Sequence, residues 1–513
     1  MNKLISNEWM KLFSRKRVIV MVVLALLSGL VSMAVLKISD NQTHVSWQES
    51  YQEEIDFYNR QIASFPEFDA QEWENETSYR ADLMRWNNQI QKYQFYLDNQ
   101  IPNWDWRLEV LEQYFNNLLQ MDCVRAGWNT DDLNRYFGYS TDIDLTQVEA
   151  QNESLMVYVL NNDYLTYNKE QLQAAEEQLR TLQEMPWVEN ADKTIALAEN
   201  DVQMWESYVQ YNAAPYARDN WMSVAIQRIH QNQEIYIENS HLSPEDPMRD
   251  EEHAEELQSI LDSAQAAVAK DRFALENHVA SYDIEMDVYT EHSTYIDFLD
   301  LSVWSSLVLV LLGIVLAAFL VASEYRYDTI KQLVIYPYKR SKILTAKFRA
   351  VELLLLMMCI VLFGINLLLG FLLFPKQGSM PIFTTYFNGN VLWMPYIVFI
   401  LVKYLLVLLQ AWVMVSMAVM LAVITRSSSI SMAISLGAYL FLRSLLNMVY
   451  TTLSAPGFLK YLLFGNLDLT QYLTNTAEVP YAPWWVSLLV ILGWWFVMRR
   501  IAYAVFKRRE IRE

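Results

Sequence analysis

The sequence predicts an all-α membrane protein with six transmembrane helices and a large helical domain inserted between the first and the second. The first observation is that uncharged apolar runs occur near the N-terminus and again after residue 300. The second is charge: residues 37–300 hold 51 acidic and 16 basic residues, a net charge of −35, whereas the remainder has a net charge of +15. The third is that residues 37–300 contain two glycines, too few for the turns of a many-stranded sheet. An acidic soluble domain is therefore inserted into a basic membrane protein.

The N-terminal residues 1–17 predict an amphipathic helix at the cytoplasmic surface of the membrane. Its apolar side chains lie near one helical face: Leu4, Ile5, Trp9, Leu12 and Phe13. A plain basic flank is the alternative. Residues 18–36 follow without a charge and would extend about 28 Å as a helix. A signal peptide is the rival interpretation, but no small-x-small cleavage site follows, so we favour a retained first membrane helix.

Residues 37–300 are expected to form long antiparallel helices packed as hairpins or a bundle, on the extracellular side. Apolar residues recur at helical spacing, as in Leu165, Leu172, Ala175, Leu179 and Leu182. Pro186 and the prolines at 244 and 247 mark helix boundaries. The two cysteines, Cys123 and Cys359, offer no disulfide framework, because the second lies in an apolar run.

The region 301–506 is predicted to contain the other five membrane helices. We expect them at residues 301–322, 351–374, 396–424, 430–446 and 484–506. A short outer loop near Pro375 and Gly378 would join the third and fourth, and short helices at 458–464 and 467–473 would dip into the membrane. The segments assigned to the inside carry 19 Lys and Arg residues, against Lys376 and Lys460 in the short outer loops. Both termini, including the tail 507–513, are therefore predicted to be cytoplasmic.

The basic segment 323–350 lies between the second and third membrane helices. Asp328 to Ile335 suits a short helix that Pro337 would end, and residues 340–349 suit a second one. The segment resembles the first cytoplasmic loop of permeases in the ABC type-2 family. The positions that carry the resemblance are Glu324, Thr329, Leu333, Pro337, Arg340 and Lys347. Asp328 departs from the family pattern, which has glycine there, and an ordinary basic inner loop is the simpler interpretation.

The resemblance implies that this loop is a coupling helix that docks into a separate ATPase subunit. It also implies a second permease copy or a related permease as partner, and short outer helices beside the exit of the pathway. Residues 7–11 look like the start of the N-terminal helix of this family. Membrane lipids are the other expected partner.

Motifs for catalysis and for cofactor binding are missing from the sequence. No G-x-x-x-x-G-K-[ST] phosphate loop occurs, so ATP and Mg²⁺ would be bound by the partner ATPase. The six histidines are scattered through residues 37–300 without a zinc-binding spacing. We therefore expect no cofactor or metal in this chain, no enzymatic activity of its own and no nucleic-acid partner.

Polar residues inside the apolar runs are the candidates for a transport pathway, because each is costly in the bilayer unless it is paired or hydrated. They are Asn366, Lys403, Gln410, Arg443 and Asn447. Lys403 and Arg443 would meet anionic substrate groups or carboxylates of the outer domain. The alternative, which we favour, is that both extend to the outer headgroups. Glu352 is expected to pair with a basic residue of the coupling loop.

The sequence therefore predicts the permease subunit of an ATP-driven exporter in the cytoplasmic membrane. The alternative is a membrane-anchored receptor or scaffold that uses its acidic outer domain to bind a peptide or protein. An intramembrane enzyme is a more distant possibility, since no catalytic constellation is visible. A scaffold needs neither a coupling loop nor polar residues in its membrane helices, and these two features favour the permease.

Overall fold

A computed structural model describes residues 2–14, 16–43, 46–64, 76–128, 130–138, 144–184, 190–242, 247–250, 253–326, 339–375, 380–387, 389–452, 461–474 and 483–508. Helices dominate these residues, and a two-stranded sheet is the one sheet among them. The chain divides into two compact units. We call residues 1–42, 292–377 and 397–513 the apolar unit, and residues 43–291 and 378–396 the polar unit.

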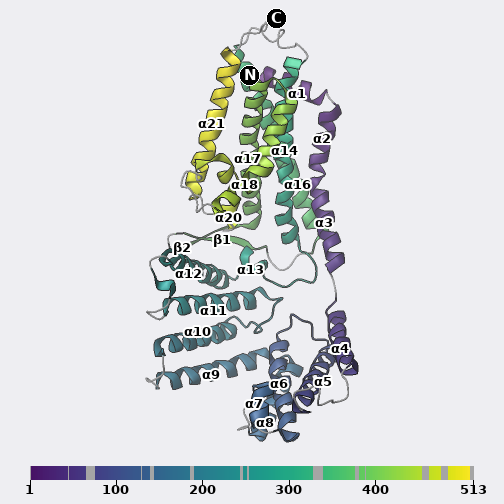
Figure 1. The fold of residues 1–513 in the computed structure, drawn as a ribbon, viewed down its shortest axis with the longest axis vertical. Coiled ribbons are helices and arrows are strands. Elements are labelled where there is room, and N and C mark those ends of the chain that lie inside the picture. The colour runs from purple at the N-terminus through teal and green to yellow at the C-terminus, as the bar shows by residue number, and fades with distance from the viewer. Residues whose placement is uncertain are drawn as a thin grey trace. The chain divides into compact units, whose positions relative to one another are not determined.

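The apolar unit is built from long helices with a few short ones (Figure 1). They are α1 (Asn2–Phe13), α2 (Lys16–Leu26), α3 (Ser28–Thr43), α14 (Tyr295–Arg326), α16 (Arg340–Leu373), α17 (Tyr396–Thr425), α18 (Ser428–Thr452), α19 (Leu463–Asn466), α20 (Gln471–Thr474) and α21 (Trp484–Arg508). Five segments are long and apolar enough to cross a membrane: Val18–Asp40, Tyr295–Glu324, Arg340–Leu373, Tyr396–Thr425 and Trp484–Arg508. They indicate a multi-pass membrane protein. In α18 the apolar stretch described is the shorter Ser428–Leu442, so the sixth crossing stays a prediction.

Two helices of the apolar unit differ from the expected pattern. The first crossing is interrupted by a turn at Leu27, between α2 and α3. Ser28 and Gly29 follow that turn, and the Ser28 hydroxyl donates to the Ala25 carbonyl at 2.6 Å, which is a known cause of kinks. The short helix predicted at 340–349 and the membrane helix predicted at 351–374 are one continuous helix, because α16 runs unbroken from Arg340 to Leu373. No proline or glycine lies near residue 350 to stop it.

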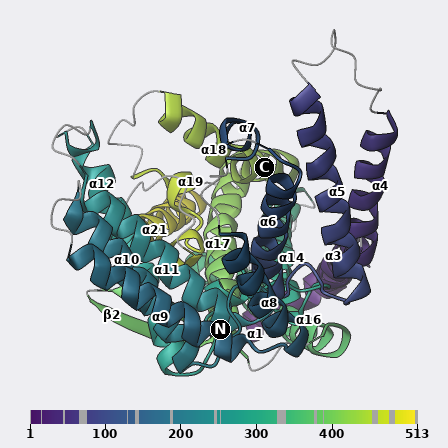
Figure 2. The ribbon, with the colours of Figure 1, turned by 90° about the horizontal axis from the view of Figure 1, so that it is seen from below.

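The polar unit is a succession of helices that pack mostly on near neighbours in sequence. They are α4 (Trp47–Ser64), α5 (Glu76–Asp98), α6 (Arg107–Arg125), α7 (Thr130–Phe137), α8 (Leu145–Asn161), α9 (Tyr164–Gln183), α10 (Ala191–Gln210), α11 (Trp221–Ser240), η1 (Pro247–Arg249), α12 (Ala254–Glu276) and α13 (Tyr282–Glu285). Helix α4 packs on α5 and α9 on α10, although α8 packs on α6 and α7 on α5. Helices α9 to α12 lie side by side (Figures 1 and 2). This confirms the predicted helical hairpins.

Aromatic side chains form much of the core of the polar unit. Trp205 contacts the rings of Tyr167 and Tyr208 at centroid distances of 5.9 and 5.5 Å, and all three side chains are buried. Such pairs stabilise a protein by more than their buried area alone would.

The starts of several helices are capped by Asp or Asn side chains. At the start of α8, for example, the Asp144 carboxylate accepts hydrogen bonds from the backbone amides of Thr146 and Gln147.

A β-hairpin that the sequence analysis did not predict belongs to the polar unit. Strand β1 (Ile382–Phe387) pairs antiparallel with β2 (Asn390–Pro395), with Phe387 opposite Asn390. Gly389 has a φ of +79°, as tight hairpin turns require. The Ile382 amide donates to the Ala280 carbonyl at 2.9 Å, which joins the hairpin to the segment before α13. The expected short outer loop at this place is therefore mostly strand.

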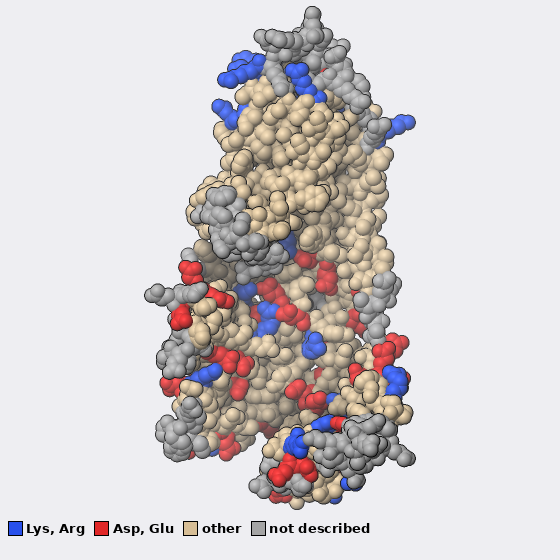
Figure 3. All heavy atoms as spheres, in the orientation of Figure 1, with Lys and Arg blue, Asp and Glu red and all other residues tan. Residues whose placement is uncertain are grey.

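Charged side chains are unevenly distributed on the surface (Figure 3). The visible face of the apolar unit is almost free of charge along its helices, and Lys and Arg gather at the end where α1 lies (Figures 1 and 3). Acidic side chains predominate on the polar unit (Figure 3). This distribution follows the charge difference in the sequence.

Candidate functional site

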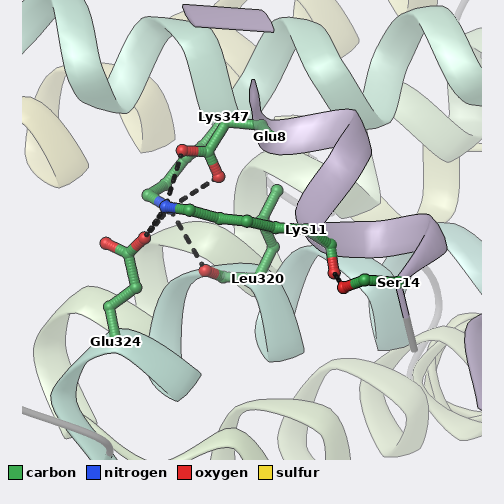
Figure 4. Close-up of polar contacts among 6 residues, drawn as sticks. All are labelled: Glu8, Lys11, Ser14, Leu320, Glu324 and Lys347. Atoms are coloured by element: carbon green, nitrogen blue, oxygen red, sulfur yellow. Dashed lines mark hydrogen bonds and ion pairs between the residues drawn. The ribbon is translucent and has the colours of Figure 1, made fainter. Parts of the chain in front are cut away.

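Four charged side chains from three helices form a cluster, the charge clamp, at the end of the apolar unit; three of them are buried and the fourth, Lys11, is exposed (Figure 4). Lys347 of α16 donates to Glu8 Oε2 at 3.0 Å and to Glu324 Oε1 at 2.7 Å. Lys11 of α1 donates to the same Glu324 oxygen at 3.0 Å and to Glu8 Oε1 at 3.3 Å. The Leu320 carbonyl is a further acceptor for Lys347, at 3.4 Å. The clamp thus joins α1 to the end of α14 and the start of α16.

The charges of the clamp balance, with two carboxylates against two ammonium groups. Lys347 is 2% exposed, and Glu8 and Glu324 are also buried. Burial alone lowers the pKa of Lys11, but the carboxylates of Glu324 and Glu8 outweigh that effect and raise its pKa above the usual range. An ion pair removed from water is strongly destabilised when one partner is lost, because the other charge remains buried. The clamp therefore stabilises α1 in this position as long as it is complete.

The clamp lies at the base of the predicted coupling loop. Its two residues on the long helices, Glu324 and Lys347, are among the six positions that carry the family resemblance. Arg340 is the first residue of α16 and is partly exposed. The other three, Thr329, Leu333 and Pro337, lie outside the described residues, as does the predicted short helix from Asp328 to Ile335.

A second contact holds α1 against α16. The Trp9 indole N–H donates to the Ala350 carbonyl at 2.8 Å. Leu12, one turn further along α1, is buried. The predicted amphipathic helix is thus present as α1, and its apolar face packs on protein instead of standing apart as a basic flank.

Glu352 pairs with a residue that the sequence analysis did not consider. Its partner is Arg499 of α21, whose guanidinium also lies over the rings of Trp495 and Phe348 at 4.1 and 4.5 Å. Arg499 further donates to the Ser416 hydroxyl at 3.2 Å. The expectation that Glu352 pairs with a coupling-loop base is therefore wrong. The guanidinium is held by a carboxylate and two aromatic faces, a favourable environment for a buried arginine.

Lys403 is buried in the apolar unit, where its ammonium group has a carboxylate partner. Its ammonium group donates to Asp300 Oδ1 at 2.5 Å and lies 4.6 Å from the centre of the Phe399 ring. The side chain of Lys403 is 7% exposed. Asp300 belongs to α14, which begins at Tyr295, six residues before the expected start at residue 301. Asp300 is the last residue of the predicted outer domain, so this contact matches the less favoured interpretation of Lys403, in which it meets a carboxylate of that domain.

The remaining pathway candidates are separate from Lys403. Gln410 donates to Asp468 Oδ1 at 3.3 Å, and Asp468 also accepts from the Thr470 hydroxyl at 2.6 Å, in the segment between α19 and α20. Arg443 and Asn447 lie on α18, and their side chains are outside the described part of the chain. In the part that is described, no hydrogen bond joins Asn366, Lys403 and Gln410 to one another.

Asn366 belongs to a buried polar cluster between α14, α16 and α17. Its amide donates to the Tyr404 hydroxyl at 2.8 Å and to the Ser305 hydroxyl at 3.2 Å. The Tyr404 hydroxyl donates in turn to the Ser302 carbonyl at 3.0 Å. The amide oxygen of Asn366 faces Gly29 of α3, where a Cβ atom would lie 1.9 Å from it. Small residues and buried polar groups are the usual means by which membrane helices approach closely.

Several residues of these clusters were missed because their partners are distant in sequence. Lys347 and Glu8 are separated by 339 positions, and no periodicity relates them. Asp300 and Arg499 were placed near the ends of predicted membrane segments. Charged residues are common there, so their presence does not point to a particular partner. Asp468 could have been found from the sequence, because it is an acidic residue within an apolar patch.

Among the described residues, no three His, Cys, Asp or Glu side chains gather as a metal site.

Comparison with known proteins shows two similarities. Residues 271–512, just under half of the chain, match the model of a family described as "Protein of unknown function (DUF2705)". The chain is also similar to Uncharacterized protein YhcI of Bacillus subtilis (strain 168), with 27% identity over 297 residues. That match takes in 57% of this chain and 88% of the relative, so much of this chain has no counterpart there. The family match includes α14 to α21 and the hairpin, and it leaves out α4 to α11.

Proposed function

We propose that this chain is the membrane-spanning permease subunit of an ATP-driven exporter and that it works with a separate ATPase. The observation that carries the proposal is the charge clamp. It fastens α1 to both helix ends that flank residues 327–338, the middle of the segment 323–350 that resembles a coupling loop. A loop that only connects two helices needs no such buried fastening, and a buried ion cluster is costly to build.

The clamp supports a route for mechanical coupling. A subunit that pulls on residues 327–338 acts on the end of α14 and the start of α16, because the loop is covalently continuous with both. Through Glu8 and Lys11 the same movement reaches α1, and through the chain it reaches α2 and α3. The long helices would then move together when the ATPase closes, as a permease requires.

The remaining parts of the proposal follow from the sequence. Six crossings place both termini in the cytoplasm and residues 37–300 outside the cell, in accordance with the distribution of basic residues. A second copy of the chain or a related permease completes the pathway. ATP and Mg²⁺ are bound by the ATPase, since this sequence contains no phosphate loop.

Affinity purification of the tagged chain from its native membrane tests the proposal. We expect a soluble ATPase with a phosphate loop to co-purify in a fixed ratio. The double variant Pro337→Ala, Arg340→Glu should lose the ATPase and still insert into the membrane. Lys507→Glu is the matched control, because it reverses an exposed basic charge at the end of α21, outside the loop, and should retain the ATPase.

The clamp variant Glu324→Gln, Lys347→Met separates docking from coupling. It should still bind the ATPase, because residues 327–338 between the two helix ends are unchanged, but it should lose stimulation of ATP hydrolysis by the permease. Unchanged ATPase recovery with the loop variant contradicts the coupling assignment. Recovery of a partner bound to the polar unit, with no ATPase, would favour the receptor or scaffold instead.

A further inference from the structure

The β-hairpin is the part of the polar unit whose surface is least like the rest of it. Residues 380–396 contain no Asp, Glu, Lys or Arg. Four large apolar side chains of this segment are exposed: Met380, Phe387, Leu392 and Trp393. Phe387 and Trp393 are 58% and 57% exposed. Successive strand residues point to opposite faces, so Leu392 and Phe387 lie on one face of the hairpin and Trp393 lies on the other. Exposed apolar side chains on both faces of so short a segment indicate surfaces that are covered in the working protein.

The helices of the polar unit are rich in charged residues and expose few large apolar side chains, unlike the hairpin. Within the described part of residues 43–291, five large apolar side chains are exposed, scattered over more than two hundred positions: Phe57, Val157, Leu160, Ile235 and Met286. Acidic residues surround them in the sequence. Single exposed apolar residues of this kind are ordinary. The concentration at the hairpin is not explained by the general composition of the unit.

The chain leads directly from the hairpin into helices of membrane length. Strand β2 ends at Pro395, and α17 begins at Tyr396 without an intervening loop. On the other side, the last turns of α16 expose Leu368, Phe371 and Leu372, and the first turn of α17 exposes Val398. The hairpin is therefore followed directly by α17 and is preceded by α16, which ends at Leu373, and both helices are long and apolar enough to cross a membrane.

We propose that the hairpin lies in the lipid interface, with Phe387 and Leu392 on one face and Trp393 on the other inserted among the headgroups and upper acyl chains. Trp and Phe at this depth place an apolar ring among lipids, and the indole N–H of Trp remains near water. The absence of charge in residues 380–396 removes the main cost of entering this region. The proposal requires that α16 and α17 cross the membrane, and it does not require the ATPase partner.

The lipid contact has a consequence for the polar unit. The hairpin is bonded to Ala280 through the Ile382 amide, and the rings of Tyr282 and Tyr396 stack at 5.3 Å. The segment from Ala280 to Tyr282 is thus fixed to the part that contacts lipid. The hairpin therefore acts as an anchor that holds this edge of the polar unit at the bilayer surface.

Site-directed fluorescence on the full-length chain in lipid nanodiscs tests the anchor. Trp393→Cys and Leu392→Cys would be labelled with an environment-sensitive fluorophore, and quenching by lipids with a nitroxide at the headgroup would be measured. Leu160→Cys, exposed on α8, is the control on the polar unit, and Leu405→Cys, exposed on α17, is the control within a crossing. The native Cys123 and Cys359 are buried, so the unsubstituted chain gives the labelling background.

The expected result is strong quenching of the labels at residues 392 and 393 by nitroxide lipid and little quenching by aqueous iodide. The label at residue 160 should show the reverse. Equal behaviour of residues 393 and 160 overturns the anchor, and so does shielding of residue 393 from both quenchers, which would indicate cover by a second protein surface. Lipid quenching at residue 405 but not at 393 would leave α17 as a crossing helix and refute the hairpin proposal alone.

Discussion

Lys347 is the residue on which the charge clamp depends. Its ammonium group contacts both carboxylates and has almost no access to water. We expect Lys347→Met, which keeps the volume and removes the charge, to destabilise the apolar unit by about 3–5 kcal/mol, because two buried carboxylates then share only Lys11. Thermal unfolding of the purified protein in detergent measures the effect.

Two comparisons make the Lys347 prediction specific. Lys342→Met removes an exposed lysine one turn away on the same helix and should change the unfolding midpoint little. Adding Glu324→Gln to Lys347→Met should recover part of the loss, because one unpaired buried charge disappears. An equal loss in the Lys342 and Lys347 variants would show that the clamp does not contribute.

Cys123 is predicted to be an inert thiol in the folded protein. It is buried on α6, and that burial raises its pKa to about 12. At pH 8 its thiolate fraction is then roughly a thousandfold lower than that of a free cysteine, so a thiol reagent should react with it only after unfolding. Because the folded pKa is raised, this group favours the folded state fully below about pH 8.5. That contribution is lost as the pH rises towards 12.

The Cys123 prediction is checked by following reagent uptake at pH 8 with and without denaturant. The variant Cys123→Ala shows which part of the reagent uptake comes from Cys123. The variant Leu160→Cys places an exposed thiol on α8 and gives the reference reaction rate of an accessible cysteine. Rapid reaction of native Cys123 at a rate near that of the reference would contradict the buried position. Raising the pH from 8 to 10 should also lower the unfolding midpoint more in the native chain than in Cys123→Ala.

At the scale of elements, the close approach of α3 to α16 rests on Gly29. A Cβ atom there would overlap the Asn366 amide oxygen, and Asn366 is held by Tyr404 and Ser305. We expect Gly29→Ala to destabilise the helix packing by about 1–3 kcal/mol, the usual cost of overpacking. Gly364→Ala, on α16 with open space around it, is the matched control.

The outcome at Gly29 is read from the same thermal unfolding assay. The double variant Gly29→Ala, Asn366→Ala should be less destabilised than the sum of the single changes, because the clash is removed. Strict additivity would mean that the two side chains do not meet.

The helix boundaries in this region could be predicted only in part. The break at Leu27 depends on Ser28 and Gly29, and the continuity of α16 depends on the absence of a helix breaker.

The hairpin was not predicted, although the sequence contains a local pattern that is typical of a hairpin turn. Asn388 and Gly389 stand between two runs of β-branched and aromatic residues, which is a recognised hairpin pattern. Apolar runs on both sides made the segment resemble a short connection between membrane helices. The strands form because they find backbone partners in each other and at Ala280, a residue about a hundred positions earlier.

For the whole molecule, the division into two units predicts that most of the polar unit can be deleted while the apolar unit still reaches the membrane. Replacing residues 46–270 by a flexible linker keeps the segment that bonds the hairpin, whereas deleting 46–291 removes it. We expect both variants to reach the membrane fraction, because all long apolar helices remain. The shorter deletion should have the higher unfolding midpoint and elute as a single species. Equal midpoints would show that Ala280 and Tyr282 do not stabilise the hairpin.

The class of this protein follows from its sequence, because hydrophobic length, charge distribution and scarcity of glycine are properties of each segment alone. The sequence also marked Glu324, Lys347 and Asn366 as special positions. The partners of the buried charges follow only from the tertiary structure. They are Glu8 for Lys347, Asp300 for Lys403 and Arg499 for Glu352, each distant in sequence from the residue it contacts. A buried charge must be paired, so its presence predicts that a partner exists. Which residue serves depends on how the helices pack, and no local pattern encodes that choice.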